Sequence, residues 1–133
     1  RIPGEYIADE NQRLRAYKKI ADIATAADAG RVVDELRDRY GNPPSELSHL
    51  VEFSLCKSIA KELGVETLEK RGQHLQVKFH PQTRMNPEKL LRMVQRMDGV
   101  QFTPAGVLRL PLKPWDSAGH LLAQVKGYLL ELQ

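Results

Sequence analysis

The sequence is poor in residues that stabilise a fold covalently or through a metal. Its single cysteine, Cys56, excludes an internal disulfide, and no second thiol is present to complete a metal pair. The four histidines stand far apart in the chain: His49, His74, His80 and His120. Tetrahedral metal sites usually show at least one close pair of ligands. We therefore expect no metal or other cofactor, and a reducing cytoplasm as the location.

Long apolar runs and familiar catalytic motifs are also missing. No apolar stretch approaches the roughly 18 residues that a membrane span needs, so we expect no contact with a membrane. The sequence contains no GxxxxGK[ST] or GxGxxG phosphate loop, no GxSxG nucleophile elbow and no HExxH helix. Hydrolysis or a nucleotide-driven reaction would need such a site. We therefore expect a domain that is not an enzyme.

What remains is the composition of a globular domain. Hydrophobic residues make up 41% and charged residues 28% of the 133 residues, a length that fits one domain with one continuous core. Residues 1–6 lack the pattern of a signal peptide, and Arg1 stands where an initiator Met would be. We expect a single monomeric domain over residues 1–133 that is part of a longer polypeptide.

The positive charge is concentrated in the second half of the chain. The formal net charge is +3 and the sequence pI is about 9.1. Residues 1–64 carry 10 Lys and Arg against 11 Asp and Glu, whereas residues 65–133 carry 10 against 6. An accessory nucleic-acid-binding module that uses this basic second half is therefore an alternative function, although the excess is small for such a role.

The first half predicts three helices. Residues 9–23 carry apolar side chains at spacings of three and four, which indicates an amphipathic helix. The positions expected to face inward are Leu14, Tyr17, Ile20, Ala21 and Ala24. Thr25 and Asp28 form a capping-box pattern before a second helix that ends at Gly41. A third helix begins near residues 43–46 and ends at Gly64.

The second half predicts two hairpins and two helices. Residues 65–70 and 73–79 flank an Arg71-Gly72 turn, and their apolar and polar residues alternate. Asn86 caps a helix whose expected inner face is Leu90, Leu91, Val94 and Met97. Residues 100–110 form a second hairpin, and a final helix follows Asp116 or Ser117. The order ααα-ββ-α-ββ-α indicates an α+β fold, with helices packed on a small, mostly antiparallel sheet. Residues 9–64 form its helical half and 65–133 its α/β half.

Cys56 and Trp115 could each have either a functional role or a packing role. Cys56 neighbours Leu55 and Ile59 in the apolar stripe of the third helix, which favours a packed thiol over a nucleophile. Trp115 precedes the last helix, and we expect it to pack against that helix as part of the core.

The acids of the second helix allow two interpretations. Asp34, Glu35 and Asp38 lie on the side away from Leu36, interleaved with arginines. They are either a solvated face with pairs such as Glu35 and Arg39, or a docking face that binds an arginine fork of a basic partner. The bases of the first helix pose the same question for an acidic or phosphate-bearing partner: Arg13, Arg15, Lys18 and Lys19.

Specific segments of the first half resemble the C-terminal domain of bacterial transcription-repair coupling factors. One segment is Ile2-Pro3-Gly4-Glu5-Tyr6-Ile7, followed by Asp9, Arg13-Leu14 and Tyr17-Lys18-Lys19-Ile20-Ala21. A second is Glu35-Leu36-Arg37-Asp38-Arg39-Tyr40-Gly41 with Pro44, followed by Leu55, Lys57, Ala60 and Leu63-Gly64-Val65. The resemblance covers residues 2–65, and the remainder agrees in the order of elements. One departure is Ala8, where the family usually has proline.

This resemblance implies a regulatory domain. In that family the full protein is an ATP-dependent DNA translocase that acts on stalled RNA polymerase and recruits the repair protein UvrA. Its C-terminal domain docks on the UvrB-like domain of the same chain, masks the UvrA-binding surface and represses activity. The docking uses acids at the positions of Glu35 and Asp38, so the resemblance favours the docking interpretation of these residues. It makes UvrA and RNA polymerase indirect partners.

The absence of a phosphate loop leads to a first prediction. The 133-residue chain should hydrolyse ATP no faster than a buffer blank, because it lacks the residues that position a triphosphate and its magnesium ion. A phosphate-release assay on the folded protein tests this. Hydrolysis that is lost on a point substitution within the chain would contradict the prediction.

Overall fold

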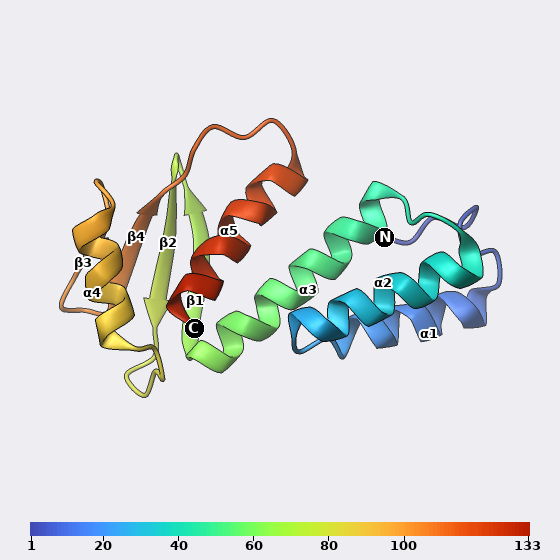
Figure 1. Ribbon diagram of the computed structural model, residues 1–133, viewed down its shortest axis with the longest axis horizontal. Coiled ribbons are helices and arrows are strands. Elements are labelled where there is room, and N and C mark those ends of the chain that lie inside the picture. The colour runs from blue at the N-terminus through green and yellow to red at the C-terminus, as the bar shows by residue number, and fades with distance from the viewer. The chain divides into compact units, whose positions relative to one another are not determined.

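The computed structural model describes residues 1–133 and divides into two compact units, Arg1–Ser58 and Ile59–Gln133. Its helices and strands follow the predicted order ααα-ββ-α-ββ-α (Figure 1). The strands form one four-stranded antiparallel sheet. The α+β prediction is therefore confirmed.

The first unit consists of helices joined by short connections. It contains α1 (Glu10–Ala21), α2 (Ala26–Tyr40) and most of α3 (Ser45–Leu63). Two serines of α3 hold the end of α1, since the hydroxyl of Ser54 donates to the carbonyl of Ile20 at 2.6 Å and that of Ser58 to the carbonyl of Ile23 at 2.5 Å. The carbonyl of Ile20 also accepts from the backbone N–H of Ile23 at 3.2 Å, so the two serines join α3 to the end of α1 and to the residues just after it.

The inner face of α1 differs from the predicted one. Leu14 is 60% exposed, and Ala21 and Ala24 are also exposed, whereas Ala16, Ile20 and Ile23 are buried. The core takes up Ala16 and Ile20 of α1, and the guanidinium of Arg13 reaches back to the N-terminal segment, where it donates to the carbonyls of Ile7 and Ala8 at 2.8 and 3.0 Å. Helical periodicity alone does not reveal that tertiary contact.

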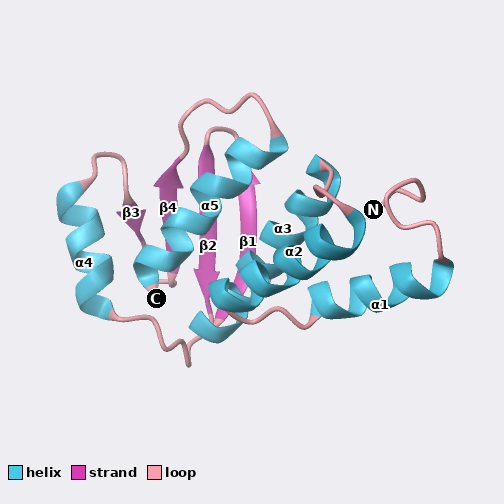
Figure 2. Cartoon of the chain, turned by 45° about the vertical axis from the view of Figure 1, so that its right-hand side comes forward, coloured by secondary structure: helices cyan, strands magenta, loops and turns pink.

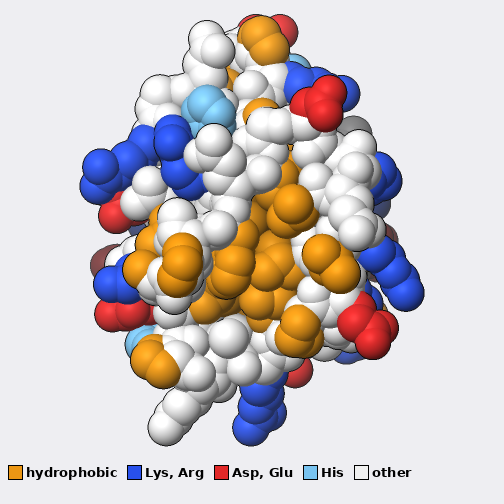
Figure 3. Space-filling model, turned by 90° about the vertical axis from the view of Figure 1, so that its left-hand side faces the viewer, with side chains coloured by type: hydrophobic (Ala, Val, Ile, Leu, Met, Phe, Trp, Pro, Cys, Tyr) orange, Lys and Arg blue, Asp and Glu red, His pale blue; other side chains and the backbone are white.

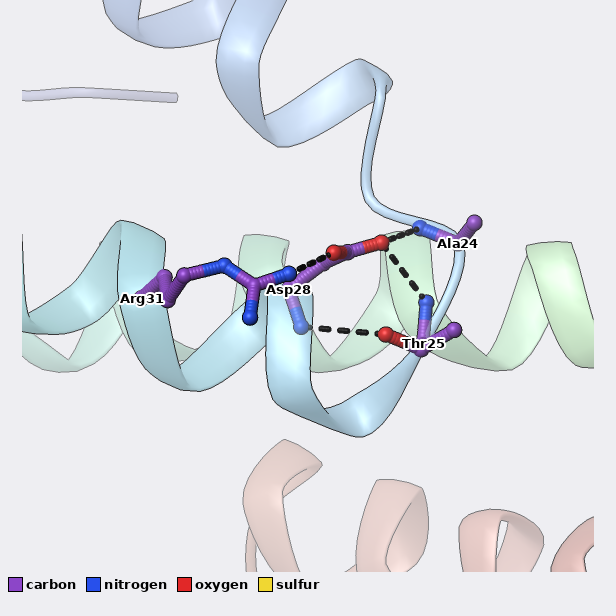
Figure 4. Close-up of polar contacts among 4 residues, drawn as sticks. All are labelled: Ala24, Thr25, Asp28 and Arg31. Carbon is purple, nitrogen blue, oxygen red and sulfur yellow. Dashed lines mark hydrogen bonds and ion pairs between the residues drawn. The ribbon is translucent and has the colours of Figure 1, made fainter.

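The capping box at the start of α2 forms as predicted (Figure 4). The backbone N–H of Asp28 donates to the hydroxyl of Thr25 at 3.1 Å, and the Asp28 carboxylate accepts from the backbone N–H groups of Thr25 and Ala24. These backbone hydrogen bonds, with a smaller contribution from Arg31, lower the pKa of Asp28. The box therefore satisfies the N–H groups that a helix start leaves free.

The second unit contains the sheet and two further helices. The strands are β1 (Val65–Arg71), β2 (His74–Phe79), β3 (Gln101–Phe102) and β4 (Val107–Pro111), and the helices are α4 (Pro87–Arg96) and α5 (Ala118–Leu132). The sheet order is β1-β2-β4-β3. Arg71 pairs with His74, so the first turn consists of Gly72 and Gln73, one residue later than predicted.

The core of the second unit lies on one side of the sheet. Leu75 and Val77 of β2 and Leu108 and Leu110 of β4 are all buried, and the register places them on the same face. Helices α4 and α5 cover this face (Figure 2). Leu90 and Met93 of α4 and Val125, Leu129 and Leu132 of α5 complete the core. The alternation along β2 and β4 thus produces the predicted one-sided sheet.

Helix α4 buries a narrower stripe than predicted. Leu90 is buried, but Leu91 is 56% and Val94 38% exposed, while Met93 is fully buried. Burial of Leu90 and Met93 sets the rotation of α4, and on the helix surface Arg96 forms an ion pair with Glu131 of α5. Phe102 of the edge strand β3 is also exposed, and hydrophobic side chains gather on the face that Figure 3 shows.

Gly64, which ends α3, is required by its surroundings. Its φ is +77°, and a Cβ there would lie 2.9 Å from the Cα of Thr83. Thr83 is held at this place because its hydroxyl donates to the carbonyl of Leu63 at 2.5 Å. Only glycine combines this backbone conformation with such a close approach. The predicted end of the third helix is therefore confirmed with a specific physical reason.

Cys56 is buried, as predicted. Trp115 is only half-buried, and the ammonium group of Lys70 lies 5.0 Å from the centre of its ring. It is therefore not the buried plug that the sequence suggests, because a cation–π contact on one ring face keeps that face near solvent. No helix combines the length and the apolar character needed to cross a membrane.

The N-cap of α2 provides a test of the local energetics. Replacing Thr25 by alanine should lower the free energy of unfolding by about 1 kcal/mol, because the N–H of Asp28 loses its acceptor. Thr25→Ser keeps the oxygen and should retain most of the stability. Urea denaturation of the three proteins measures the difference. Equal stability of the alanine and serine variants would contradict the assigned cap.

Candidate protein-docking site

The candidate site is the exposed face of α2, whose rotation is set by Leu36. The Leu36 side chain is 4% exposed, and the hydroxyl of Tyr6 donates to the carbonyls of Leu36 at 3.1 Å and Gly41 at 2.8 Å. These bonds attach the N-terminal segment to the end of α2. Burial raises the pKa of Tyr6, so its hydroxyl keeps its proton as the donor.

Glu35 lies beside this buried stripe and already has a partner. Its carboxylate forms an ion pair with the ammonium group of Lys19 on α1, and the two side chains are 43% and 46% exposed. The hydrogen bond from Lys19 is the largest cause of a lowered Glu35 pKa, and the charge of Arg39 contributes less. The predicted pairing of Glu35 with Arg39 is therefore wrong. Arg39 instead lies over the ring of Tyr40, 5.4 Å from its centre.

Asp38 has no partner within the chain. It is exposed, and its carboxylate takes part in no ion pair or side-chain hydrogen bond, whereas the neighbouring Asp34 pairs with Arg37 at 3.4 Å. Residues three positions apart on a helix have Cβ atoms about 5–6 Å from each other. Glu35 and Asp38 therefore present two carboxylates within reach of one arginine fork, or of two neighbouring basic side chains.

Two residues that shape this site were not identified from the sequence. Lys19 is 16 positions before Glu35, and Tyr6 is 30 positions before Leu36. Pairs separated by that much chain leave no periodic signal, so they emerge only when α1 and the N-terminal segment pack against α2. Both residues lie within the segments that carry the family resemblance.

The bases of α1 do not form a free cationic patch. Arg13 donates to backbone carbonyls and Lys19 is paired with Glu35. Only Arg15 and Lys18 remain exposed without an ion pair in this helix. The affinity of a protein for nucleic acid grows with the number of phosphates that its cations neutralise. Arg15 and Lys18 alone would therefore give only a low affinity.

Many bases of the second half are likewise compensated. Arg71 pairs with Glu69, Lys78 with Glu66 and Arg96 with Glu131. Lys89 donates to the terminal carbonyl of Gln133, and Lys70 lies over Trp115. At least five of the ten bases of the second half thus take part in contacts within the chain, which reduces the number available to phosphate groups.

Surface hollows of the first unit are lined in part by Glu46. One of about 640 Å³ is lined by Arg1, Arg13, Tyr17 and Glu46 among others, and one of about 410 Å³ by Tyr6, Asn42 and Glu46 among others. Cys56 and the histidines line neither. The pKa of Glu46 is lowered, chiefly by its own backbone N–H and the Ser45 hydroxyl. Glu46 shares the larger hollow with Glu10 and the smaller one with Glu5.

Comparisons with known proteins agree on one relationship. The profile of the TRCF domain matches residues 1–90. The transcription-repair-coupling factor of Myxococcus xanthus is 30% identical over 98% of this chain, which corresponds to 11% of the relative. That of Escherichia coli K12 is 30% identical over 71% of this chain and 8% of the relative. The chain thus spans about a tenth of the length of these relatives.

A solved structure shares the fold. The crystal structure of a C-terminal domain of transcription-repair coupling factor superimposes with a TM-score of 0.81 and covers 98% of this chain and 84% of that one. The sequence identity is 20%, so this likeness concerns the fold.

The ion pair of Lys19 with Glu35 can be tested by titration. Lys19→Gln should raise the pKa of Glu35 toward its ordinary value, because the main cause of the lowering is removed. Arg39→Gln should raise it less.

A carboxyl that is more acidic in the folded state contributes stability above its unfolded pKa and loses it as the pH falls through the folded value. The stability difference between wild type and Lys19→Gln, at most about 1 kcal/mol for an exposed pair, should therefore vanish in acid. Carboxyl-detected NMR and melting curves measure both; equal pKa values in the two variants would contradict the pairing.

Proposed function

The chain belongs to the TRCF domain family, and we infer that it acts in transcription-coupled DNA repair as a non-catalytic regulatory domain. In this proposal it docks on the UvrB-like domain of its parent protein through Glu35 and Asp38. Docking would mask the surface that UvrA uses and keep the parent protein repressed. UvrA and RNA polymerase are then indirect partners, and the ATP-driven translocation belongs to other domains of the parent.

One observation carries the proposal: Asp38 is an exposed carboxylate without a partner, next to Glu35 on a helix face that the core does not use. Buried arginines on a partner would find both acids already aligned by α2. Charge-assisted hydrogen bonds between carboxylates and guanidinium groups are directional, and they are stronger than bonds between neutral groups. This arrangement favours binding to a partner with arginines at defined positions over nonspecific association with cations.

Because Glu35 is already paired with Lys19, docking through Glu35 would exchange one cationic partner for another. An arginine of the partner would replace the ammonium of Lys19 at the Glu35 carboxylate, so part of the new interaction offsets a lost one. Asp38 has no such internal competitor. We therefore expect Asp38 to contribute more to docking than Glu35, and Lys19 to weaken it.

A tethered domain needs only a modest interface to stay closed. Flexible tethering gives effective concentrations in the millimolar range, roughly, so even a weak contact remains mostly formed. Release then requires a coupling free energy of about 1–3 kcal/mol, the range typical of allosteric switches. A small polar interface built on two carboxylates is suited to such a reversible contact.

Charge reversal tests the proposal. Glu35→Lys with Asp38→Lys should shift the melting temperature of the chain only slightly, because exposed changes usually alter stability by about 0.5 kcal/mol each. At the interface, removing one side of a desolvated charge pair costs roughly 2–5 kcal/mol, and reversal adds repulsion. Affinity for the UvrB-like domain of the parent should therefore fall by orders of magnitude, and the full-length protein should capture UvrA more readily.

The matched control is Glu62→Lys with Asp116→Lys, which changes the net charge equally at exposed positions of the second unit. Calorimetric binding to the UvrB-like domain and UvrA pull-down should be unaffected by this control. If the variant at Glu35 and Asp38 melts normally yet binds and captures UvrA like the wild type, these acids are only a solvated face.

A further inference from the structure

The sheet of the second unit is covered on one face only. Helices α4 and α5 lie over the face that carries the buried strand residues (Figures 1 and 2). No side chain on the opposite face is buried. We call this opposite side the open face. It is formed by Thr67, Glu69, Arg71, His74, Gln76, Lys78, Gln101, Val107, Arg109 and Pro111.

Arg109 occupies the centre of the open face. It lies on β4, an interior strand, and its cross-strand neighbours are Gln76 on β2 and Gln101 on β3. The acid in the same row is Glu69 on β1, which lies two strands away, or about 10 Å at the usual strand spacing. The guanidinium group is therefore flanked by neutral amides rather than by carboxylates.

The other cations of this face are paired, and Arg109 is not. Arg71 pairs with Glu69 at 3.1 Å, and Lys78 lies 3.9 Å from the carboxylate of Glu66. Arg109 forms no ion pair, and its Nε is the one buried side-chain nitrogen or oxygen in the structure without a hydrogen-bond partner. Arg109 as a whole is half-buried, but its Nε–H is shielded from water and has no acceptor, and such groups in folded proteins call for a specific explanation.

We propose that the open face is a docking surface for an acidic segment of a partner protein, in which Arg109 receives an Asp or Glu carboxylate. A carboxylate that approaches the guanidinium from its side accepts from Nε and one Nη together. A small movement of the flexible Arg109 side chain toward that carboxylate would satisfy the unpaired Nε. The amides of Gln76 and Gln101 are placed to hydrogen-bond the backbone on either side.

The chemistry of the face favours a protein over a nucleic acid. Open sheets that bind single strands stack bases on aromatic side chains and follow the backbone with several cations. The open face carries no Phe, Tyr or Trp, and Arg109 is its one cation without an ion pair. One guanidinium group, that of Arg109, between the amides of Gln76 and Gln101 can bind a single carboxylate.

The test uses the 133-residue chain and a synthetic peptide of alternating aspartate and serine. At an ionic strength of about 0.15 M, exposed charges more than about 8 Å apart are largely screened, which suppresses nonspecific attraction. The peptide should shift the Nε–H resonance of Arg109 in ¹⁵N-edited NMR spectra, in a saturable way. An oligothymidine of equal charge should shift it less. The absence of a peptide shift, or a larger shift with oligothymidine, would overturn the proposal.

Variants of Arg109 distinguish the paired hydrogen bonds of its guanidinium group from the effect of its positive charge alone. Arg109→Gln and Arg109→Lys should each lower the peptide affinity by about tenfold, because a lysine keeps the charge but cannot make the paired hydrogen bonds. The control Arg92→Gln removes an exposed, unpaired charge from α4 and should change the affinity by less than about twofold. Amide spectra verify that each variant is folded. Equal losses in the Arg92 and Arg109 variants, or full retention in Arg109→Lys, would refute a directional site at Arg109.

Discussion

Burial of Leu36 sets the rotation of α2, and the chemistry of the first unit depends on that rotation. Ala29, seven positions earlier, is buried on the same face, and the Tyr6 hydroxyl holds the far end of the helix through the carbonyls of Leu36 and Gly41. With these anchors, Asp38 must point away from the core and Glu35 must lie at its margin. A turn of one residue would move Glu35 toward the core, where a carboxylate without a partner is strongly disfavoured.

The ion pair of Lys19 with Glu35 bears on the docking contact proposed for Glu35 and Asp38. It joins α1 to α2 across exposed surface, where such pairs contribute little to stability. In the proposed docking its larger effect would be on recognition, because an external cation that binds the Glu35 carboxylate would compete with Lys19. The two candidate docking acids therefore differ in kind: Asp38 is ready for a partner, whereas Glu35 must exchange one.

The two units present opposite electrostatic problems to a partner. In the first, a free carboxylate stands on a helix surface and needs a cation. In the second, several cations are paired within the chain, and Arg109 lies on an open sheet face with its Nε unpaired. An uncompensated charge surrounded by compensated ones gives directional recognition, since the partner must supply the missing group at one position.

Local chemistry in the sequence was sufficient to determine the element order, the α+β class, the capping box of Thr25 and Asp28, the glycine ends of α2 and α3 and the burial of Cys56. Each depends on neighbours a few residues apart, where spacing fixes geometry. The faces of α1 and α4, the partner of Glu35, the half-exposed Trp115 and the isolation of Arg109 were decided by tertiary structure. Leu14 and Leu91 carry the same apolar signal as buried leucines, but the core takes up Ala16 and Ile20 of α1 and Leu90 and Met93 of α4 instead. Contacts between residues distant in the chain leave no periodic trace, because their energy exists only once the elements have packed.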